Sequence, residues 1–339
     1  MSSRPQVVNV DVNFSYEQET LRVEAAGADF VLRRAKTEDE IIKACGDATM
    51  ILFENADTPL NARVMAALPK LKAIVRYGVG VDSIDMGEAT KRGIVVANSA
   101  DYCTEEVSDH AVALLMAAAR RIARLDRKIR SGGWVGYNPN QPMRRLSRLT
   151  LGLLGWGRIA QAVARKMAGF QMRILVSDPY VKSLPAGSGV ELVSREQLLR
   201  EADLLSLHLP LNAETRHLIN EETLALMKPS AFLINTSRGG IVDEAALIRA
   251  LREEKLAGAG LDVFEVEPLP AGSPLRGMEQ VILTPHYAAS SQDAMTHLHG
   301  TVTDSIEALL KGYWPPFPVN RDVVPRVALR PWSDFKPSR

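Results

Sequence analysis

Short apolar runs rich in β-branched residues alternate with helix-like stretches through the first hundred positions of the chain. The apolar runs occupy residues 7–12, 29–32, 50–53, 72–75 and 94–97. Between two of them, Thr37 followed three residues later by Glu40 is typical of a capping box, and Pro59 indicates the start of another helix. Short connections between alternating strands and helices predict right-handed crossovers and a parallel sheet covered on both faces. We therefore expect one α/β unit here.

A second series of the same kind begins near Thr104. This threonine and the two glutamates after it predict a cap and an acidic first turn for a long helix that runs to Ala119. Strand-like runs return at residues 149–154, 172–176, 203–207, 232–234, 260–263 and 281–283. After Ser290 a helical pattern continues to Leu310. The predicted fold class is α/β, with two doubly wound parallel-sheet domains.

Composition narrows the class of protein. The 339 residues suffice for two domains, and 46% apolar with 24% charged residues is close to the globular average. Lys and Arg number 41 against 40 Asp and Glu, so no general positive field favours nucleic acid or an anionic membrane. Cys45 and Cys103 form neither a disulfide framework nor a metal-ligand spacing, and the apolar run 111–119 is too short to span a bilayer. We expect a cytoplasmic protein that binds neither nucleic acid nor membrane.

One glycine motif predicts a dinucleotide site. The sequence Gly-Trp-Gly-Arg-Ile-Ala at residues 155–160 follows an apolar strand and leads into a helix. Gly155 permits the tight turn, Gly157 lets a pyrophosphate approach the backbone, and Ala160 lets the helix pack on the strand. Asp178 follows the next strand, where a carboxylate hydrogen-bonds the ribose hydroxyls and repels a 2′-phosphate. The pattern predicts NAD(H) rather than NADP(H); the alternative is a tight strand-to-helix connection with a chance acid behind it.

Three further segments end predicted strands of the second sheet, at the edge where doubly wound folds bind ligands. They are residues 235–240, 261–268 and 284–288, and they contribute an arginine, two glutamates and a histidine. Taken singly, each has a structural explanation as a helix-capping arginine, a solvated acid or a loop histidine. His297 and His299 lie two apart in a helical pattern and point away from each other, so we expect no metal site.

These segments occur in the order that is found in one enzyme family. Together with residues 76–82 and 102–107, they make the chain resemble the D-isomer-specific 2-hydroxyacid dehydrogenases over residues 72–290. That family includes phosphoglycerate dehydrogenases and glyoxylate/hydroxypyruvate reductases. Residues 76–82 and 102–107 resemble most closely the branch that contains the C-terminal-binding-protein corepressors and their bacterial relatives.

The resemblance also implies a domain organisation. A flavodoxin-like substrate-binding domain is formed by residues 1–102 and 289–320, and a Rossmann NAD-binding domain of residues 103–288 is inserted into it. Family members are commonly homodimers joined through the cofactor domain. Residues 321–339, with their prolines and arginines, are expected to form a C-terminal tail that lies on the surface or reaches a neighbouring subunit.

The resemblance implies catalytic roles for three residues. Arg238 orients the substrate, His286 donates and accepts the proton, and Glu267 pairs with that histidine. A guanidinium suits a 2-oxo acid because it contacts the carboxylate and the adjacent carbonyl with a charge that never titrates. An imidazolium stabilises the oxygen that becomes negative on hydride transfer, and a neighbouring carboxylate favours that charged form. Glu265 is the alternative for this acidic role. The family pattern favours Glu267, because the functional acid of the family directly precedes a proline.

Other positions match ligand-binding residues of the family. The cofactor set is Thr104, Gly155, Gly157, Arg158, Ile159, Asp178, Leu209, Pro210, Thr236, Ser237, Asp262 and Ala288. The substrate set is Arg76, Val79, Gly80, Arg238 and His286. Val79 and Gly80 contribute backbone amides, and Asp262 is expected near the nicotinamide amide. Arg76 either receives a second anionic group of the substrate or pairs with a nearby aspartate as part of the structure.

Two hypotheses from different classes follow. The first is an NAD-dependent oxidoreductase that interconverts a D-2-hydroxy acid and a 2-oxo acid. The second is an NAD(H)-sensing, corepressor-like binding protein whose assembly depends on the dinucleotide. Rapid turnover favours the first, and NADH-dependent dimerisation without turnover favours the second. The substrate itself is left open among glyoxylate, hydroxypyruvate, phosphohydroxypyruvate and aromatic 2-oxo acids.

Overall fold

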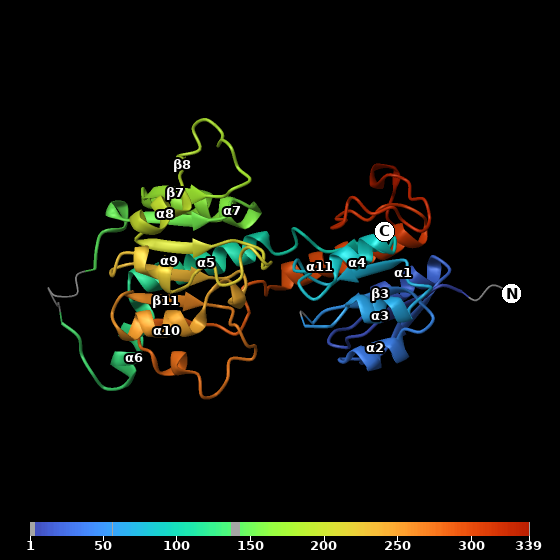
Figure 1. Cartoon of the computed structure of the whole chain (residues 1–339), viewed down its shortest axis with the longest axis horizontal. Coiled ribbons are helices and arrows are strands. Elements are labelled where there is room, and N and C mark those ends of the chain that lie inside the picture. The colour runs from blue at the N-terminus through green and yellow to red at the C-terminus, as the bar shows by residue number, and fades with distance from the viewer. Residues whose placement is uncertain (1–3, 56, 137–142, 339) are drawn as a thin grey trace. The chain divides into compact units, whose positions relative to one another are not determined.

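The structure is a computed structural model that describes residues 4–55, 57–136 and 143–338 (Figure 1). The chain divides into two compact units. Unit 1 comprises residues 1–102 and 291–339, and unit 2 comprises residues 103–290. Each unit contains a parallel sheet flanked by helices, so the predicted α/β fold class with two parallel-sheet domains is confirmed.

Unit 1 is built on a five-stranded parallel sheet in the order β2-β1-β3-β4-β5, which is the order of flavodoxin-like folds. The strands are β1 (Gln6–Asn9), β2 (Asp29–Leu32), β3 (Ala48–Phe53), β4 (Ala73–Arg76) and β5 (Val95–Ala97). The helices are α1 (Glu17–Ala25), α2 (Glu38–Ala44), α3 (Ala62–Ala67), α4 (Met86–Lys91) and α11 (Gln292–Leu310). Helix α11 comes from the far end of the chain and packs on α1 and β4, which completes the unit.

Unit 2 contains a seven-stranded parallel sheet in the order β12-β11-β10-β9-β6-β7-β8. Its strands are β6 (Thr150–Leu154), β7 (Arg173–Ser177), β8 (Val190–Leu192), β9 (Leu204–Leu207), β10 (Phe232–Asn235), β11 (Gly258–Leu261) and β12 (Val281–Leu283). Its α-helices are α5 (Thr104–Ala119), α6 (Ile122–Arg130), α7 (Arg158–Met167), α8 (Arg195–Glu201), α9 (Glu221–Leu226) and α10 (Glu244–Arg252). The strand order reverses between β6 and β9, because β7 and β8 are added on one side of β6 and β9 to β12 on the other. Ligands of such sheets bind at this switch point, so the carboxyl ends of β6 and β9 are the expected ligand crevice.

Short 3₁₀ turns complete the secondary structure. They are η1 (Leu146–Arg148), η2 (Ala168–Phe170), η3 (Gly239–Ile241) and η4 (Pro274–Gly277) in unit 2 and η5 (Trp332–Asp334) in unit 1. Within the described ranges, no helix combines the length and apolar character needed to cross a membrane.

Most predicted elements are present, and the exceptions have physical causes. The Thr37 capping box exists at the start of α2. Helix α3 begins three residues after Pro59, with Asn61 as its cap. Thr104 is not the cap of α5, because Cys103 holds that position without a side-chain bond and Thr104 is the first helical residue. Strand β8 was not predicted, because this three-residue edge strand is only partly buried and lacks an apolar run.

The C-terminal segment contacts other parts of unit 1. Arg326 donates to the carbonyl oxygens of Arg92 at 2.7 Å and Pro69 at 2.6 Å. The Arg330 guanidinium lies 3.7 Å from the centre of the Tyr313 ring. These contacts attach the segment to its own unit.

A buried carboxylate in unit 1 leads to a pH-dependent stability. Burial opposes ionisation of Glu307, but hydrogen bonds from Lys311, Ser338 and Arg22 outweigh it and lower the pKa of this carboxyl to about 2. Because the folded-state pKa lies below the ordinary 4.5, the stabilisation is complete above 4.5 and disappears as the pH falls towards about 2. It amounts to at most about 3 kcal/mol. Thermal melts across this pH range should show a steeper loss of stability for the wild type than for Glu307→Gln, and parallel curves would contradict the assignment.

Candidate active site

The dinucleotide motif forms the turn between β6 and α7. Gly155 has a φ of +95°, and a Cβ at this position would lie 2.4 Å from the His208 carbonyl oxygen, so only glycine fits. A Cβ on Gly157 would meet no atom within 4 Å, which leaves open space before the first turn of α7. Ala160 is fully buried where the helix packs on the sheet. The turn therefore fits a pyrophosphate bound by backbone amides at a helix start, with Arg158 and Ile159 in the first turn.

Asp178 lies beside this turn because β7 pairs with β6 in parallel. Its Oδ2 accepts a hydrogen bond of 2.8 Å from the Trp156 amide, and its Oδ1 accepts one of 2.9 Å from the Tyr180 amide. These two bonds hold the carboxylate at the dinucleotide turn. This arrangement fits a ribose whose hydroxyls donate to the acid, as in other dinucleotide-binding folds.

The remaining predicted cofactor residues of unit 2, apart from Thr104, follow neighbouring strands of the same sheet. Leu209 and Pro210 follow β9, Thr236 and Ser237 follow β10, Asp262 follows β11, Ala288 follows β12, and Thr104 begins α5. The Ser237 hydroxyl donates to the Leu207 carbonyl at 2.6 Å, which ties the loop after β10 to β9. The Thr236 hydroxyl is buried without a hydrogen-bond partner among the described residues. An unpaired buried hydroxyl at this edge is suited to a polar ligand group.

Asp262 holds the loop that carries His286. Its carboxylate accepts hydrogen bonds from the Thr284 hydroxyl at 2.6 Å and from the amides of Tyr287 and Ala288 at 2.9 Å each. Its backbone oxygen accepts the His286 amide at 2.7 Å. The side chain is 1% exposed. These bonds fix the loop, and the contact of Asp262 with the nicotinamide amide stays a prediction.

His286 and Glu267 contact each other directly. The His286 Nδ1 lies 2.6 Å from Glu267 Oε2, and the other carboxylate oxygen accepts the Phe264 amide at 3.0 Å. Burial raises the pKa of Glu267, but the hydrogen bonds from His286 and Phe264 and the charges of His286 and Arg238 outweigh it. The net pKa of this carboxyl is below its ordinary value, so it is ionised at neutral pH. The Nδ1 contact fixes the ring and leaves Nε2 on the opposite side for a ligand.

Glu265, the competing acid, has a different partner. Its carboxylate contacts His217 Nε2, and its amide faces the Glu244 carboxylate at 3.4 Å. The structure thus brings Glu267 and not Glu265 to His286. Within the described ranges, no three or more His, Cys, Asp or Glu side chains are grouped to hold a metal ion.

Arg238 reaches the same region through an unusually close approach of two loops. A Cβ on the next residue, Gly239, would lie 1.9 Å from the Phe264 carbonyl, so the loops after β10 and β11 touch only because this residue is glycine. The Arg238 guanidinium donates to the Ser237 carbonyl at 2.7 Å. Its charge acts on Glu267. The role of Gly239 was not predicted, because a contact between distant loops leaves no local sequence signal.

In unit 1, the turn of residues 78–80 follows β4 and presents two backbone amides. The Val79 carbonyl accepts from Asn98 at 2.7 Å, and the Gly80 carbonyl accepts from Arg76 at 3.2 Å. In the part of the chain that the structure describes, neither the Val79 nor the Gly80 amide donates a hydrogen bond. Two adjacent unused amides are suited to a carboxylate.

The position of Arg76 favours the structural alternative over a second anion site. Its side chain is buried, lies 4.9 Å from the centre of the Phe53 ring, and donates to the carbonyls of Phe53, Tyr77 and Gly80. A guanidinium used in this way braces the 78–80 turn from behind. A contact of Arg76 with an anionic group of the substrate stays a prediction.

Comparison with known proteins adds the family context. A family model described as "D-isomer specific 2-hydroxyacid dehydrogenase, NAD binding domain" matches residues 112–288. A glyoxylate reductase of Korarchaeum cryptofilum is 46% identical over 288 residues, covering 84% of this chain and 86% of the relative. A D-3-phosphoglycerate dehydrogenase of Mycobacterium leprae is 39% identical over 87% of this chain, but the match spans only 56% of that relative. A solved glyoxylate reductase from Paecilomyes thermophila has a TM-score of 0.85 at 28% identity, covering 93% of this chain and 98% of that one.

Proposed function

The chain belongs to the D-isomer-specific 2-hydroxyacid dehydrogenase family and is an NAD-dependent enzyme. We propose that it interconverts a small 2-oxo acid and its D-2-hydroxy acid. The observation that carries this proposal is the 2.6 Å contact between His286 and Glu267, with the charge of Arg238 beside it. We propose glyoxylate or hydroxypyruvate as the substrate, because relatives that match over most of their length are glyoxylate reductases. The engagement of Arg76 with backbone carbonyls gives no support to a phosphorylated substrate.

Each catalytic residue then has one task. When bound, the reduced nicotinamide supplies the hydride that adds to the carbonyl carbon of the 2-oxo acid. Arg238 binds the carboxylate and the carbonyl oxygen and stabilises the negative charge that develops on that oxygen. His286 Nε2 donates a proton to the same oxygen. Glu267 stabilises the imidazolium through Nδ1 and fixes its orientation.

Substrate binding also draws on unit 1. The unused amides of Val79 and Gly80 bind the substrate carboxylate in this proposal, and Arg76 and Asn98 hold the turn by its carbonyls.

The experiment that tests this function is NADH oxidation by the purified protein against a panel of 2-oxo acids. Rapid turnover of one small acid, with a D-2-hydroxy acid as product, is the expected result. NADH binding without turnover of any acid, accompanied by NADH-dependent dimerisation, would favour the corepressor-like alternative. The names of the relatives, which are enzymes, do not favour that alternative.

Asp178 is expected to set the preference for NADH over NADPH. In Asp178→Ala, the ratio of kcat/KM for NADH to that for NADPH should fall by roughly tenfold, because the ribose loses a charged acceptor and a 2′-phosphate loses a repelling charge. A suitable control is Glu191→Gln, since this acid lies on the same sheet but pairs with Arg173. An unchanged ratio in the Asp178 variant would remove this residue from the cofactor site.

Unit 2 carries a surface that supports the proposed homodimer. Helix α6 has no buried residue, and Ile122, Ile129 and, beyond the helix, Trp134 and Val135 expose apolar side chains. Exposed apolar side chains of this size are typical of an interface. Light scattering on the purified protein should give the mass of a dimer, and a monomer would contradict this assignment.

We also propose a cytoplasmic location, which the two buried, free cysteines support. Fractionation of the source cells tests this location.

A further inference from the structure

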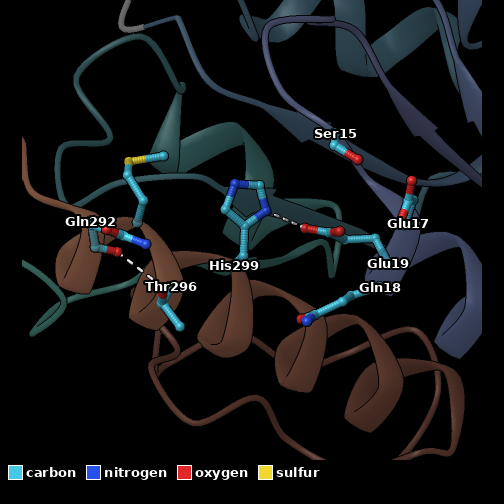
Figure 2. Close-up of a pocket in the computed structure, with 8 residues that line it drawn as sticks. Ser15, Glu17, Gln18, Glu19, Gln292, Thr296 and His299 are labelled. Atoms are coloured by element: carbon cyan, nitrogen blue, oxygen red, sulfur yellow. Dashed lines mark hydrogen bonds and ion pairs between the residues drawn. The ribbon is translucent and has the colours of Figure 1, made fainter.

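Unit 1 contains a polar cavity of about 360 Å³ between the N-terminal parts of α1 and α11 (Figure 2). The residues that line it do not include the 78–80 turn. The α11 residues that line it recur every three or four positions and therefore share one helix face. Figure 2 shows His299 of this face pointing at Glu19 of α1. Neither residue has a task in the reaction described above.

Glu19 is a buried carboxylate with two donors on one oxygen. Its side chain is 1% exposed, and its Oε1 lies 2.6 Å from His299 Nδ1 and accepts the Tyr77 hydroxyl at 3.1 Å. Burial, together with the charge of Glu19, raises the pKa of Tyr77 well above its ordinary value. The phenol therefore stays protonated and donates to the carboxylate. A buried carboxylate requires such donors, because an unpaired buried charge is strongly unfavourable.

Tyr77 connects this pair to the turn that carries the two unused amides. Its amide donates to the Phe53 carbonyl at 2.9 Å, and the next residue begins the turn. Its ring meets the His299 ring edge-on, with ring centres 5.5 Å apart, and the Tyr16 ring in the same manner at 6.1 Å. The side chain is thus fixed at its hydroxyl end by Glu19 and along its ring by aromatic neighbours. Any movement of Tyr77 is passed directly to the backbone of residues 78–80.

We propose that Tyr77, Glu19 and His299, here called the anchoring triad, are positioning residues that hold the amides of Val79 and Gly80 in place for the substrate carboxylate. The inference rests on the proposed function of the 78–80 turn. The triad belongs to unit 1, whereas the predicted cofactor residues belong to unit 2. It therefore acts on substrate affinity alone.

The kinetic signature follows from this division of tasks. The substrate carboxylate is bound equally in the ground state and in the transition state, so a displaced amide pair raises KM for the 2-oxo acid and leaves kcat nearly unchanged. The KM for NADH is also unchanged, because the cofactor residues belong to unit 2. A purely structural role of the triad predicts a loss of stability without this selective change.

The test uses two disruptive variants, one conservative variant and one control. Tyr77→Phe removes only the hydroxyl, and His299→Ala removes the second donor to Glu19. Each should raise KM for the 2-oxo acid by roughly three- to tenfold. His299→Asn retains a nitrogen near the Nδ1 position and should restore most of the affinity. Thr296→Ala is the control, since Thr296 lines the same cavity but its hydroxyl donates to the Gln292 carbonyl within its own helix.

The outcomes separate this inference from the proposed function. If the wild type turns over a 2-oxo acid but Tyr77→Phe and His299→Ala leave its KM unchanged, the anchoring triad is refuted and the reaction stands. If kcat and the KM for NADH change together with the substrate KM, the selective role is also refuted. Absence of turnover in the wild type contradicts the proposed function and this inference with it. Should His299→Ala fail to fold, Tyr77→Phe and His299→Asn decide the matter.

Discussion

Replacing Arg238 by alanine is expected to lower kcat/KM for reduction of the 2-oxo acid by roughly a thousandfold, the scale seen when a group that stabilises a developing oxyanion is lost. The guanidinium contacts both the carboxylate and the carbonyl in the proposed complex, so its removal weakens binding and raises the barrier. Arg238→Lys should recover only part of the activity, because an ammonium cannot make two parallel contacts. Steady-state kinetics at saturating NADH measure both variants.

Arg249→Ala provides the matched control for this arginine. Arg249 lies on α10 of the same unit and bonds the exposed Glu221 carboxylate at 2.9 Å. Its removal should leave kcat/KM unchanged. The dissociation constant for NADH, measured by fluorescence, should be unaltered in Arg238→Ala. A loss of activity in this variant of less than about tenfold would remove Arg238 from the reaction.

Replacing His286 is expected to have the second large effect on catalysis. His286→Ala removes the proton donor and should lower kcat by roughly 10²- to 10⁴-fold. Glu267→Gln keeps the shape of the side chain but not its charge, and it should cost less, because Glu267 acts through the histidine. Since the two residues act as a unit, the double variant should be no worse than His286→Ala alone. Single-turnover rates at saturating substrate separate these steps from product release.

His297→Ala is the control for this pair, because His297 is an exposed histidine in unit 1 that lies 3.7 Å from Asp101. It should retain wild-type kcat. Additive losses in the His286 and Glu267 double variant would contradict the idea that the carboxylate acts through the imidazole. A wild-type rate for His286→Ala would contradict the mechanism itself.

The fold was largely predictable because its central strands are buried on both faces. Such strands appear as continuous apolar runs, as in residues 73–76 and 150–154. Strand β8 escaped prediction because it lies at the sheet edge and is partly exposed. The contacts of the C-terminal segment were not predictable either, because its attachment through Arg326 depends on backbone carbonyls of distant residues that no local pattern reveals.

The candidate site shows the same division between local and distant information. The dinucleotide turn was predictable because strand, glycines, helix and Asp178 form one continuous pattern. The separate partners of Glu265 and Glu267 were not predictable from spacing, since the two acids lie two residues apart and only the folded loops distinguish them. The bracing role of Arg76 is likewise a matter of burial, which its place in the sequence does not disclose.

The central claim is that hydride passes between the nicotinamide and the C2 carbon of a 2-oxo acid to form the D product. The most direct measurement uses hydroxypyruvate with NADH that is deuterated at the reactive C4 position. NMR and chiral analysis should find the deuterium at C2 of glycerate of the D configuration. Product of the L configuration, or glycerate without deuterium at C2 when the transferable C4 position is labelled, would contradict the account.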